Sequence, residues 1–356
     1  MANTKLETVL TQWQNLQPLA EIDRDRLSRR FTIDFNYNSN HIEGNTLTYG
    51  QTELLLLFGK IVGEANFRDC EEMKASNVGL QMMLVESSDK QLPLTQNFIR
   101  TLHRTLLRED YTVYRMLPGG VQTSYVIHAG QYKTRPNSVI TRYGDRFEYA
   151  SPEETPALMA DLVDWYNHAE QEGKLSPIDL AILFHYRYIR IHPFEDGNGR
   201  IARLMVNYIL SRHGYPMIVV RSRLKQDYLE ALHRADLIVG STPADGAHAS
   251  LKDIRPFHKY MVNLICHEIE NDVLFVTEKS QDVWWYDGER IAFRTPSYGK
   301  ILQELRREPK ATLAYLQEEI GINRSALQKL LQTLLDKHYV ERDADGSWRV
   351  FITPSM

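Results

Sequence analysis

Hydrophobic residues recur at intervals of three and four along most of the chain, a spacing that places them on one face of an α-helix. The N-terminal example comprises Leu6, Val9, Leu10, Trp13 and Leu16. Comparable patterns predict helices over about 31–44, 51–59, 67–86 and 95–107. Gly44 is placed to end the first of these four, because glycine readily adopts the left-handed conformation that closes a helix. The pattern therefore predicts a mainly α-helical protein.

Local start and stop signals define three further helices in the middle of the chain. The sequence Ser151-Pro-Glu-Glu154 combines a capping box with proline at the first helical position. Ser176-Pro177 opens a second helix, which we expect to continue to His192. After a polar, glycine-rich loop a third helix is expected over 200–212, with Gly214 just beyond its end.

Two segments depart from the helical pattern. Residues 119–149 are rich in Val, Tyr, Thr, Gly and Arg without helical spacing, and we interpret them as a β-hairpin or an extended flap. Soon after Trp284 an Asp-Gly pair predicts a hairpin turn, and Pro296 and Gly299 indicate a linker. Beyond the linker, the order helix, helix, turn at Gly321, helix and two short strands is that of a winged helix.

The chain of 356 residues is long enough for two or three domains. We expect an N-terminal helical region over 1–95, a helical core with a hairpin flap over 96–280, and a linker with a small α+β winged-helix domain over 281–356. Hydrophobic residues at 43% and charged residues at 25% are ordinary for a chain that forms buried cores.

Charge and targeting signals narrow the class of protein. The balance of 42 basic and 46 acidic residues argues against general coating of nucleic acid, although it allows a local basic patch. The first residues lack the apolar core of a signal peptide, and the longest apolar run, 54–58, is far too short to span a membrane. Cys70 and Cys266 form no CxxC motif and are expected to be buried in a reducing compartment. These features predict a cytoplasmic protein without membrane contact.

The strongest candidate for chemistry is the loop from His192 to Arg203, between two predicted helices. Gly197 and Gly199 permit positive φ and a close approach of the backbone to a ligand. The N–H groups that begin the next helix make an anion site, and Arg200 and Arg203 lie three residues apart on that helix. Two guanidinium groups on one side of a helix N-terminus suit a polyphosphate better than a single carboxylate.

Two other side chains of this loop suit the same chemistry. Asp196, beside the anion site, can hold Mg²⁺, which binds few carboxylates together with phosphate oxygens. His192, with an unperturbed pKa of about 6.5, suits a general base for a hydroxyl nucleophile. Each feature alone has a structural explanation, since a histidine before proline is usually structural and Gly-Asn-Gly is usually a turn. Their occurrence together favours an active site, although neither a Walker A motif nor GxGxxG is present in the loop.

The stretch His192-Pro-Phe-Glu-Asp-Gly-Asn-Gly-Arg-Ile-Ala-Arg203 matches HPFx(D/E)GNGRxxR at every position, so the chain resembles the Fic (filamentation induced by cAMP) family. The resemblance extends over roughly residues 30–240 and implies a Fic-type helical core with a flap. Members of that family transfer AMP from ATP to a Ser, Thr or Tyr hydroxyl of a protein. The Doc branch, which phosphorylates instead, carries lysine where this chain has Gly199, and this difference favours AMP transfer.

The resemblance also implies roles for individual residues. His192 would deprotonate the target hydroxyl, and Asp196 would hold the Mg²⁺ that bridges the α- and β-phosphates of ATP. Arg200 would grip the outer phosphates, and Arg203 would reach the γ-phosphate. The anion hole would be formed by Gly197, Asn198 and Gly199.

The sequence Ser39-Asn-His-Ile-Glu43-Gly44 fits the inhibitory motif of the same family, (S/T)xxxE(G/N). Ser39 and Glu43 are four residues apart and so share one face of a short helix, for which a solvated glutamate is the structural alternative. By resemblance, Glu43 would pair with Arg203, occupy the space of the γ-phosphate and leave ATP in a pose unsuited to in-line attack. Because the motif precedes the catalytic loop, the chain resembles the subclass with an N-terminal inhibitory helix, with which a homodimer is compatible.

Two further features are implied by the family. Segment 130–140 resembles its flap, on which a target's extended backbone docks as an added strand, and a plain surface hairpin is the alternative. Tyr228 lies where the family often lines the adenine pocket, and a core tyrosine fits the pattern as well. Three other histidines lack metal-ligand spacing and are interpreted as structural or solvated, namely His103, His185 and His267.

The C-terminal winged helix predicts recognition of DNA or of protein. Residues 300–356 include nine basic and eight acidic residues, and this nearly neutral balance favours protein docking over DNA binding. Two alternatives to AMP transfer stay open. One is a DNA-binding regulator that uses the pocket to sense a nucleotide. The other is an enzyme that removes AMP from a modified protein, with Glu43 orienting water.

Overall fold

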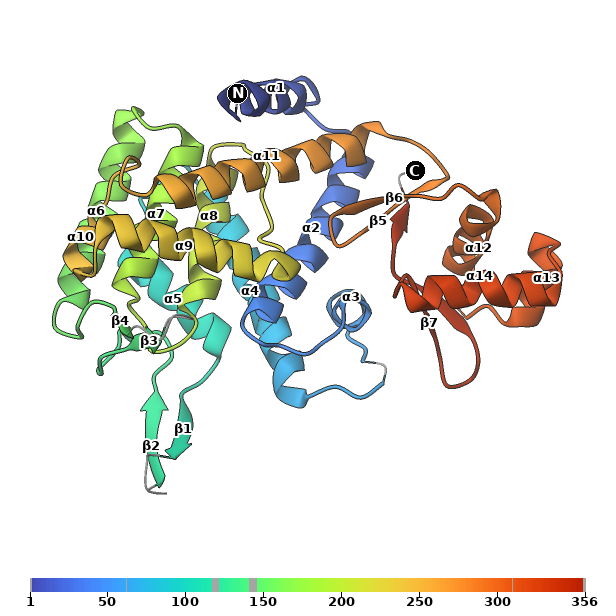
Figure 1. The fold of residues 1–356 in the computed structure, drawn as a ribbon, viewed down its shortest axis with the longest axis horizontal. Coiled ribbons are helices and arrows are strands. Elements are labelled where there is room, and N and C mark those ends of the chain that lie inside the picture. The colour runs from blue at the N-terminus through green and yellow to red at the C-terminus, as the bar shows by residue number, and fades with distance from the viewer. Residues whose placement is uncertain (1, 62, 117–121, 141–145, 309, 355–356) are drawn as a thin grey trace.

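The computed structural model describes residues 2–61, 63–116, 122–140, 146–308 and 310–354. Helices form one large body, and the C-terminal domain lies beside it (Figure 1). Within the described residues the strands form three two-stranded sheets and one three-stranded sheet. None of the described helices combines the length and the apolar composition that crossing a lipid bilayer requires.

The N-terminal half begins with five helices. They are α1 (Ala2–Asn15), α2 (Glu21–Ile42), α3 (Tyr49–Phe58), α4 (Phe67–Ser88) and α5 (Gln96–Leu107). The four helices predicted between 31 and 107 are all present, but α2 begins at Glu21, well before the expected Phe31. Its first turn carries Glu21 and Asp23, and acidic side chains stabilise the positive N-terminal end of a helix. The extra turns carry mostly charged residues, so the hydrophobic pattern did not reveal them.

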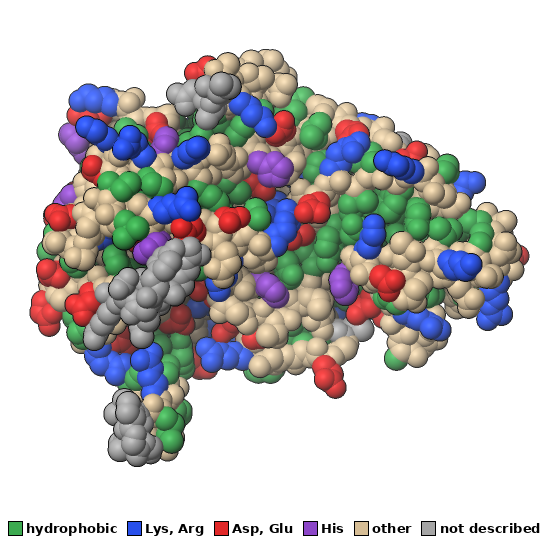
Figure 2. Space-filling model, in the orientation of Figure 1, with side chains coloured by type: hydrophobic (Ala, Val, Ile, Leu, Met, Phe, Trp, Pro, Cys, Tyr) green, Lys and Arg blue, Asp and Glu red, His purple; other side chains and the backbone are tan. Residues whose placement is uncertain are grey.

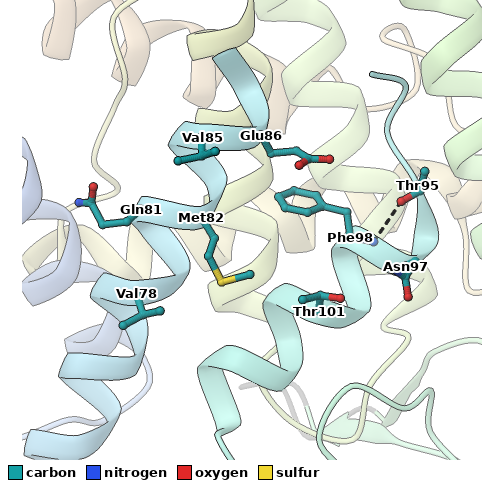
Figure 3. A pocket seen from close by; sticks show the side chains of 9 residues that line it. All are labelled: Val78, Gln81, Met82, Val85, Glu86, Thr95, Asn97, Phe98 and Thr101. Atoms are coloured by element: carbon teal, nitrogen blue, oxygen red, sulfur yellow. Dashed lines mark hydrogen bonds between the residues drawn. The ribbon is translucent and has the colours of Figure 1, made fainter. Parts of the chain in front are cut away.

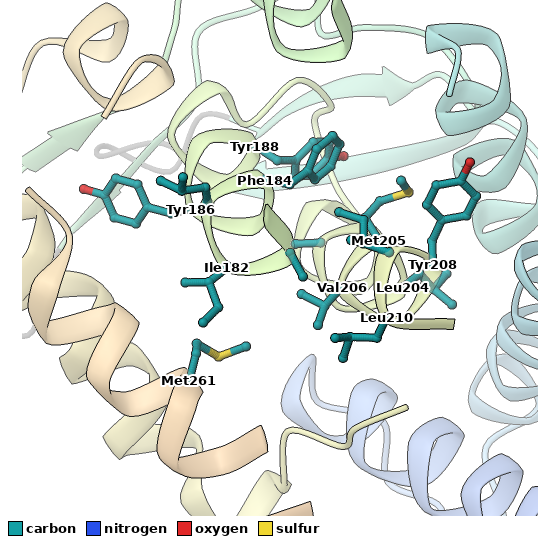
Figure 4. Close-up of a cluster of buried hydrophobic side chains, with 14 of the residues drawn as sticks. Ile182, Phe184, Tyr186, Tyr188, Leu204, Met205, Val206, Tyr208, Leu210 and Met261 are labelled. Carbon is teal, nitrogen blue, oxygen red and sulfur yellow. The ribbon is translucent and has the colours of Figure 1, made fainter. Parts of the chain in front are cut away.

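Six helices build the centre of the molecule. They are α6 (Thr155–Glu172), α7 (Pro177–Ile191), α8 (Asn198–Arg212), α9 (Lys225–Val239), α10 (Pro243–Ala247) and α11 (Arg255–Thr277), with a 3-10 turn, η1, over Ser222–Leu224. Helices α7 and α8 pack against each other with fully buried Phe184, Tyr188, Met205 and Tyr208, and Met261 of α11 lies next to Ile182 (Figure 4). The two helices that flank the candidate loop are therefore deeply embedded in the core.

The predicted start of α6 is one turn too early. The capping box itself forms, because the Ser151 N–H donates to Glu154 Oε2 at 2.9 Å and the Glu154 N–H donates to Ser151 Oγ at 3.2 Å. These bonds close a turn, and the helix begins only at Thr155, with Pro156 in its first turn. Proline suits either first turn, so the sequence did not distinguish the two starts.

The segment predicted as one hairpin or flap contains parts of two hairpins. Strand β1 (Tyr111–Met116) pairs with β2 (Gln122–Ile127), and β3 (Ser138–Ile140) pairs with β4 (Arg146–Glu148), both antiparallel. The first hairpin projects from the helical body (Figure 1). Two stretches of the predicted segment, 119–121 and 141–145, lie outside the described residues.

The C-terminal part has the predicted winged-helix order. It comprises β5 (Val283–Tyr286), β6 (Glu289–Ala292), α12 (Pro296–Arg307), α13 (Leu313–Ile320), α14 (Arg324–Asp336), β7 (Val340–Arg342), β8 (Trp348–Val350) and β9 (Thr353–Pro354). The expected linker at Pro296 and Gly299 is wrong, since both residues belong to α12. Proline fits the first turn of a helix, and a Cβ on Gly299 would lie 3.3 Å from Asp282 Oδ1, so glycine serves close packing here rather than flexibility.

Buried charges join α2 to α11 and to the β5–β6 turn. Arg221 forms ion pairs with Asp34 of α2 at 2.8 Å, with Glu268 of α11 at 2.7 Å and with Asp287 of the turn at 3.0 Å. The three carboxylates raise the pKa of Arg221 although its burial acts in the opposite direction. Asn38 of α2 also donates to Asp287 Oδ1 at 2.6 Å. A buried cation requires such partners, so this cluster fixes α2 against the C-terminal part.

An apolar groove of about 570 Å³ lies between α4 and α5. Met82 and Phe98 point into it from the two helices, and Val78 and Val85 border it (Figure 3). Its lining residues do not include any part of the His192–Arg203 loop.

The winged helix has a hydrophobic cluster of its own, centred on α12 and α14. Leu331 of α14 is fully buried in that cluster, so we expect Leu331→Ala to lower the free energy of unfolding of this domain by about 2–5 kcal/mol. Hydrogen exchange of residues 296–354 measures the effect, and Lys329→Ala on the exposed face of α14 is the matched control. Equal protection of α14 in the two variants would contradict the assignment of this core.

Candidate active site

The candidate loop begins where α7 ends. His192 follows the last residue of α7 and adopts the left-handed conformation, with φ 51° and ψ 60°. Its N–H donates to the Tyr188 carbonyl at 2.9 Å, which closes the helix. A left-handed conformation is unfavourable for a residue with a Cβ, so the surrounding contacts must hold it in place.

Asn198, near the other end of the loop, stabilises the loop conformation through hydrogen bonds of its side-chain amide. Its Oδ1 accepts from the Phe194 N–H at 3.0 Å, and its Nδ2 donates to the Phe194 carbonyl at 2.7 Å. Asn198 is 2% exposed, and both ends of its amide are used within the loop. Only its backbone N–H is therefore left to contribute to an anion site.

His103 of α5 packs against the loop and supports it, a role that its position in the sequence did not indicate. Its ring stacks on Phe194, with centroids 3.7 Å apart and planes 6° apart. Nδ1 accepts from the Gly130 N–H at 2.8 Å, so the opposite nitrogen, Nε2, donates to the Asp196 carbonyl at 2.9 Å. Burial lowers the pKa of His103 to about 4, which keeps the ring neutral at neutral pH.

The flap segment is bonded directly to the loop. Lys133, 3% exposed, donates from Nζ to the carbonyls of Ile191 at 3.1 Å and His192 at 2.9 Å. Its backbone N–H donates to the Pro193 carbonyl at 2.9 Å, and Asn137 donates to the Phe194 carbonyl at 3.0 Å. Burial lowers the pKa of the Lys133 ammonium to about 7. Part of the predicted flap is thus a support of the loop rather than a surface hairpin.

The His192 ring is held between the loop and Tyr149. The two rings are stacked, with centroids 3.9 Å apart and planes 13° apart. Burial, and after it the positive charge of Lys133, lowers the pKa of His192 to about 3. The imidazole is therefore neutral at neutral pH and has a nitrogen able to accept a proton.

Helix α8 presents an uncapped N-terminus next to His192. Gly197 occupies the N-cap position with φ 76°, and among the described residues no side chain caps this helix end. Arg200, 6% exposed, lies one turn into the helix. The unpaired N–H groups, the helix dipole and this guanidinium combine into a site for an anion.

Asp196 stands at the edge of the same site. Its Oδ2 accepts from the Tyr111 hydroxyl at 2.6 Å and lies 3.5 Å from an Arg200 nitrogen, and its Oδ1 accepts from the Gly197 N–H at 2.6 Å. Burial acts to raise the pKa of Asp196, but the charge of Arg200 and the Tyr111 hydrogen bond outweigh it and hold the pKa below its usual range. Tyr111, at the start of β1, is a site residue that no sequence signal indicated.

The surroundings of Asp196 fit a magnesium ion that is shared with a ligand. No group of three His, Cys, Asp or Glu side chains gathers anywhere in the described part of the chain, so the protein offers no complete cage. The Asp196 side chain is 40% exposed and borders a cavity of about 360 Å³ that also touches Arg68, Arg108 and Arg200. One accessible carboxylate beside an anion site matches the donor set that Mg²⁺ uses with phosphate oxygens.

The α2 helix reaches this site through Arg203. Arg203 is 3% exposed and donates from Nε to Ser39 Oγ at 3.0 Å, and from NH2 to the Ser39 carbonyl at 2.8 Å and to Glu43 Oε1 at 2.6 Å. Burial acts to raise the pKa of Glu43, but the charges of Arg203 and Arg200 outweigh it and lower the pKa. Lys225 donates to the Ile42 carbonyl at 2.6 Å and so holds the end of α2.

The Glu43 carboxylate rests against the backbone of the anion site. A Cβ built on Gly199 would collide with Glu43 Oε1, so only glycine admits the carboxylate at this position. Helix α2 ends at Ile42, and Glu43 follows it as the capping residue, with Gly44 at φ 101°. The structure therefore brings together the two motifs that the sequence places well apart in the chain.

Tyr228 lies in the core beneath this site. It is 2% exposed, its hydroxyl is 2.8 Å from His185 Nε2, and its ring contacts Phe257 and Tyr260. Burial raises the pKa of Tyr228 to about 12 and lowers that of His185 to about 3. The surroundings are those of a core tyrosine, and its adenine-pocket role stays a prediction. His185 and His103 are structural, and His267 lies 3.3 Å from Asn271.

Comparison with known proteins places this geometry in a family. The Fic/DOC family profile matches residues 93–210, and a winged helix-turn-helix DNA-binding profile matches residues 299–341. The protein adenylyltransferase fic-1 of Caenorhabditis elegans is 29% identical over 287 residues, which cover 80% of this chain and 49% of that protein. The chain thus spans about half the length of the curated relatives it matches.

Two solved structures have the same fold. A Fic domain containing signaling protein from Bacteroides thetaiotaomicron superposes with a TM-score of 0.70 and 52% identity, covering 76% of this chain and 96% of that one. A segment of Fic-1 from C. elegans superposes with a TM-score of 0.59 and 25% identity, covering 76% and 72%. With the matching profile, the loop and this coverage, the chain belongs to the Fic/DOC family.

Proposed function

We propose that the protein is a self-inhibited adenylyltransferase, which transfers AMP from Mg-ATP to a Ser, Thr or Tyr hydroxyl of a protein, itself included. The observation that carries the proposal is one loop that joins a neutral, half-buried His192 to the uncapped N-terminus of α8. Curated relatives named protein adenylyltransferase support the reaction type, at 26–30% identity.

In the proposed reaction the target hydroxyl attacks the α-phosphorus of ATP. A new oxygen–phosphorus bond forms, the bond to the β-phosphate oxygen breaks, and pyrophosphate leaves. His192 takes the hydroxyl proton, which its lowered pKa permits because the ring enters the reaction neutral. Its stacking on Tyr149 and the bonds from Lys133 to the backbone hold the ring in one orientation.

The negative charge of the phosphates would be stabilised by groups that the loop already holds in position. The backbone N–H groups of 198 and 199 and the Arg200 guanidinium need not reorganise during the reaction, because Asn198 and His103 already hold the loop. The Gly197 N–H would first have to leave Asp196 Oδ1. Asp196 would hold Mg²⁺, which would neutralise part of the phosphate charge. Phosphoryl-type transfer depends chiefly on positioning and charge of this kind.

Inhibition would come from Glu43. Its carboxylate pairs with Arg203 and lies against Gly199, where a γ-phosphate would otherwise meet the same arginine. Two negative groups cannot share this space, so bound ATP would be displaced from an in-line pose. Activation would require α2 to release Arg203.

The target protein would dock on the flap. Strand β3 belongs to a two-stranded sheet, so among the described strands one of its edges has no neighbour. The flap base is bonded to the catalytic loop through Lys133 and Asn137, which would set a docked strand at a fixed distance from His192. Pairing through backbone groups gives little discrimination between sequences.

Transfer of labelled AMP from α-³²P-ATP with Mg²⁺ tests the function and its inhibition together. Glu43→Gly should increase the label on protein at least about tenfold, because Arg203 becomes free for the γ-phosphate. Adding His192→Ala to Glu43→Gly should reduce labelling by about 10²–10⁴-fold, the usual contribution of a general base.

Glu7→Gly, at an exposed glutamate of α1, is the matched control and should label like the unmodified chain. Equal labelling of Glu43→Gly and the unmodified chain would contradict the proposed inhibitory role of Glu43. No label in any variant, with ATP still bound, would instead favour removal of AMP with Glu43 orienting water, or nucleotide sensing coupled to DNA binding.

The Glu43–Arg203 pair should also appear as a pH-dependent contribution to stability. The pKa of Glu43 is lower in the folded protein than its unfolded value of about 4.3, so the contribution is present above that pH and is lost as the pH falls through the folded pKa.

At pH 7 we expect Glu43→Gln to lower the free energy of unfolding by about 1 kcal/mol, a small value because the Glu43 side chain is 39% exposed. Urea unfolding of both proteins at pH 7 and at pH 3 measures this. A difference of the same size at both values would mean that the charge of Glu43 does not stabilise the fold.

A further inference from the structure

A second cavity, of about 610 Å³, lies between the inhibitory region and the winged helix. One wall is built by α2 and α3 with the residues just after α3, and the other by α12, Lys310 and β8 with the residue that follows it. Figure 1 shows α3 facing the C-terminal domain across this boundary. The volume is that of an ordinary small-molecule site, and none of its lining residues belongs to the His192–Arg203 loop.

The charges around this cavity are strongly unbalanced. A single carboxylate, Glu53, lines it, against five cationic side chains: Arg29, Lys60, Arg306, Lys310 and Arg349. Arg349 pairs with Asp343 at 2.5 Å. The other four cations form no ion pair within 4 Å with any residue that the structure describes. All four of these cations are exposed, so an anion from solvent can reach them.

The lone carboxylate does not compensate for these cations. Glu53 is half-buried, and this burial raises its pKa to about 7 although Arg29 and Arg306 attract it. Partial desolvation, and after it the positive charges of Arg29 and Arg26, lowers the pKa of Arg306 although its side chain is exposed. An anion bound between Arg29 and Arg306 would be attracted by both guanidinium groups.

The remaining residues that line the cavity are apolar, and they indicate which group a ligand would carry besides an anion. Leu54, Phe58, Ile61, Leu305 and Phe351 form an apolar surface beside the cations. Phe351 is fixed in place because its ring packs on Gly50, where a Cβ would lie only 2.6 Å from it. An apolar wall with a few convergent polar groups is the composition of a small-molecule site, and arginine pairs suit a phosphate.

We infer that this cavity is a binding site for a small phosphate-bearing molecule that also carries an apolar, planar group. The phosphate lies between Arg29 of α2 and Arg306 of α12, and the planar group lies against the apolar wall. The site is separate from the ATP site, so it does not depend on the proposed reaction. Its ligand joins the helix that carries Glu43 to the winged helix.

Fluorescence titration of the full chain with 1-naphthyl phosphate tests the site, with inorganic phosphate as the ligand that lacks the planar group. We expect 1-naphthyl phosphate to bind more tightly than phosphate, and Arg29→Gln with Arg306→Gln to weaken its binding at least about tenfold. Arg324→Gln with Lys329→Gln, two exposed cations of α14, is the matched control and should bind like the unmodified chain.

Arg200→Gln separates the two phosphate sites. Binding that is lost in Arg200→Gln but kept in the Arg29–Arg306 variant would place the ligand at α8 and overturn the inference. Equal affinity for the two probes, or no binding of either, would also overturn it. A short duplex DNA that binds through Arg29 and Arg306, while 1-naphthyl phosphate does not, would assign the cations to a nucleic-acid backbone instead.

The melting temperature of the Arg29–Arg306 variant, measured without ligand, shows whether the variant is folded. Because Arg29 and Arg306 repel each other, replacing both should leave the melting temperature of the chain unchanged or raise it. Should this variant fail to fold, Lys60→Gln with Lys310→Gln removes two exposed cations of the same cavity and should weaken binding in the same direction.

Discussion

The burial of Arg203 is the constraint on which the arrangement of the catalytic region depends. A guanidinium cannot lose its charge, and in the interior it must be surrounded by acceptors. Ser39 and Glu43 supply those acceptors from α2. The end of α2 is therefore bound to α8 through Arg203. In the proposed activation a phosphate would replace Glu43 as the anion that Arg203 contacts, so the guanidinium would keep a negative partner.

In the proposed activation this exchange would not remain local, because α2 is also held elsewhere. Asp34 and Asn38 join it to the Arg221 cluster and to the β5–β6 turn, and Arg29 faces the winged helix across the basic cavity. One rigid helix thus carries contacts to the catalytic loop at one end and to the C-terminal domain along its length. On the face drawn in Figure 2, basic and acidic side chains are interspersed, which agrees with the nearly balanced charge of the chain.

The fold was predictable where the signal is repeated and local. Hydrophobic spacing, together with end signals such as Ser176-Pro177, predicts helices α3 to α8. The errors fall where one residue type has two structural uses. Pro296 and Gly299 suggested a linker, yet the first starts α12 and the second makes room for Asp282. Proline and glycine mark both breaks and close packing, and only the neighbours in space distinguish the two.

The sequence by itself determined which groups the loop offers, because its glycines, arginines, Asp196 and His192 lie within twelve consecutive residues and their spacing fixes their relation on one helix N-terminus. It also supplied the Ser39–Glu43 pair, whose spacing sets both on one face. Only the tertiary structure decided which side chains hold that loop. His103 of α5, Tyr111 of β1, Lys133 after β2 and Tyr149 after β4 reach it from four different segments. Their contacts follow from the packing of whole elements, and packing of distant segments leaves no periodic trace in a single sequence.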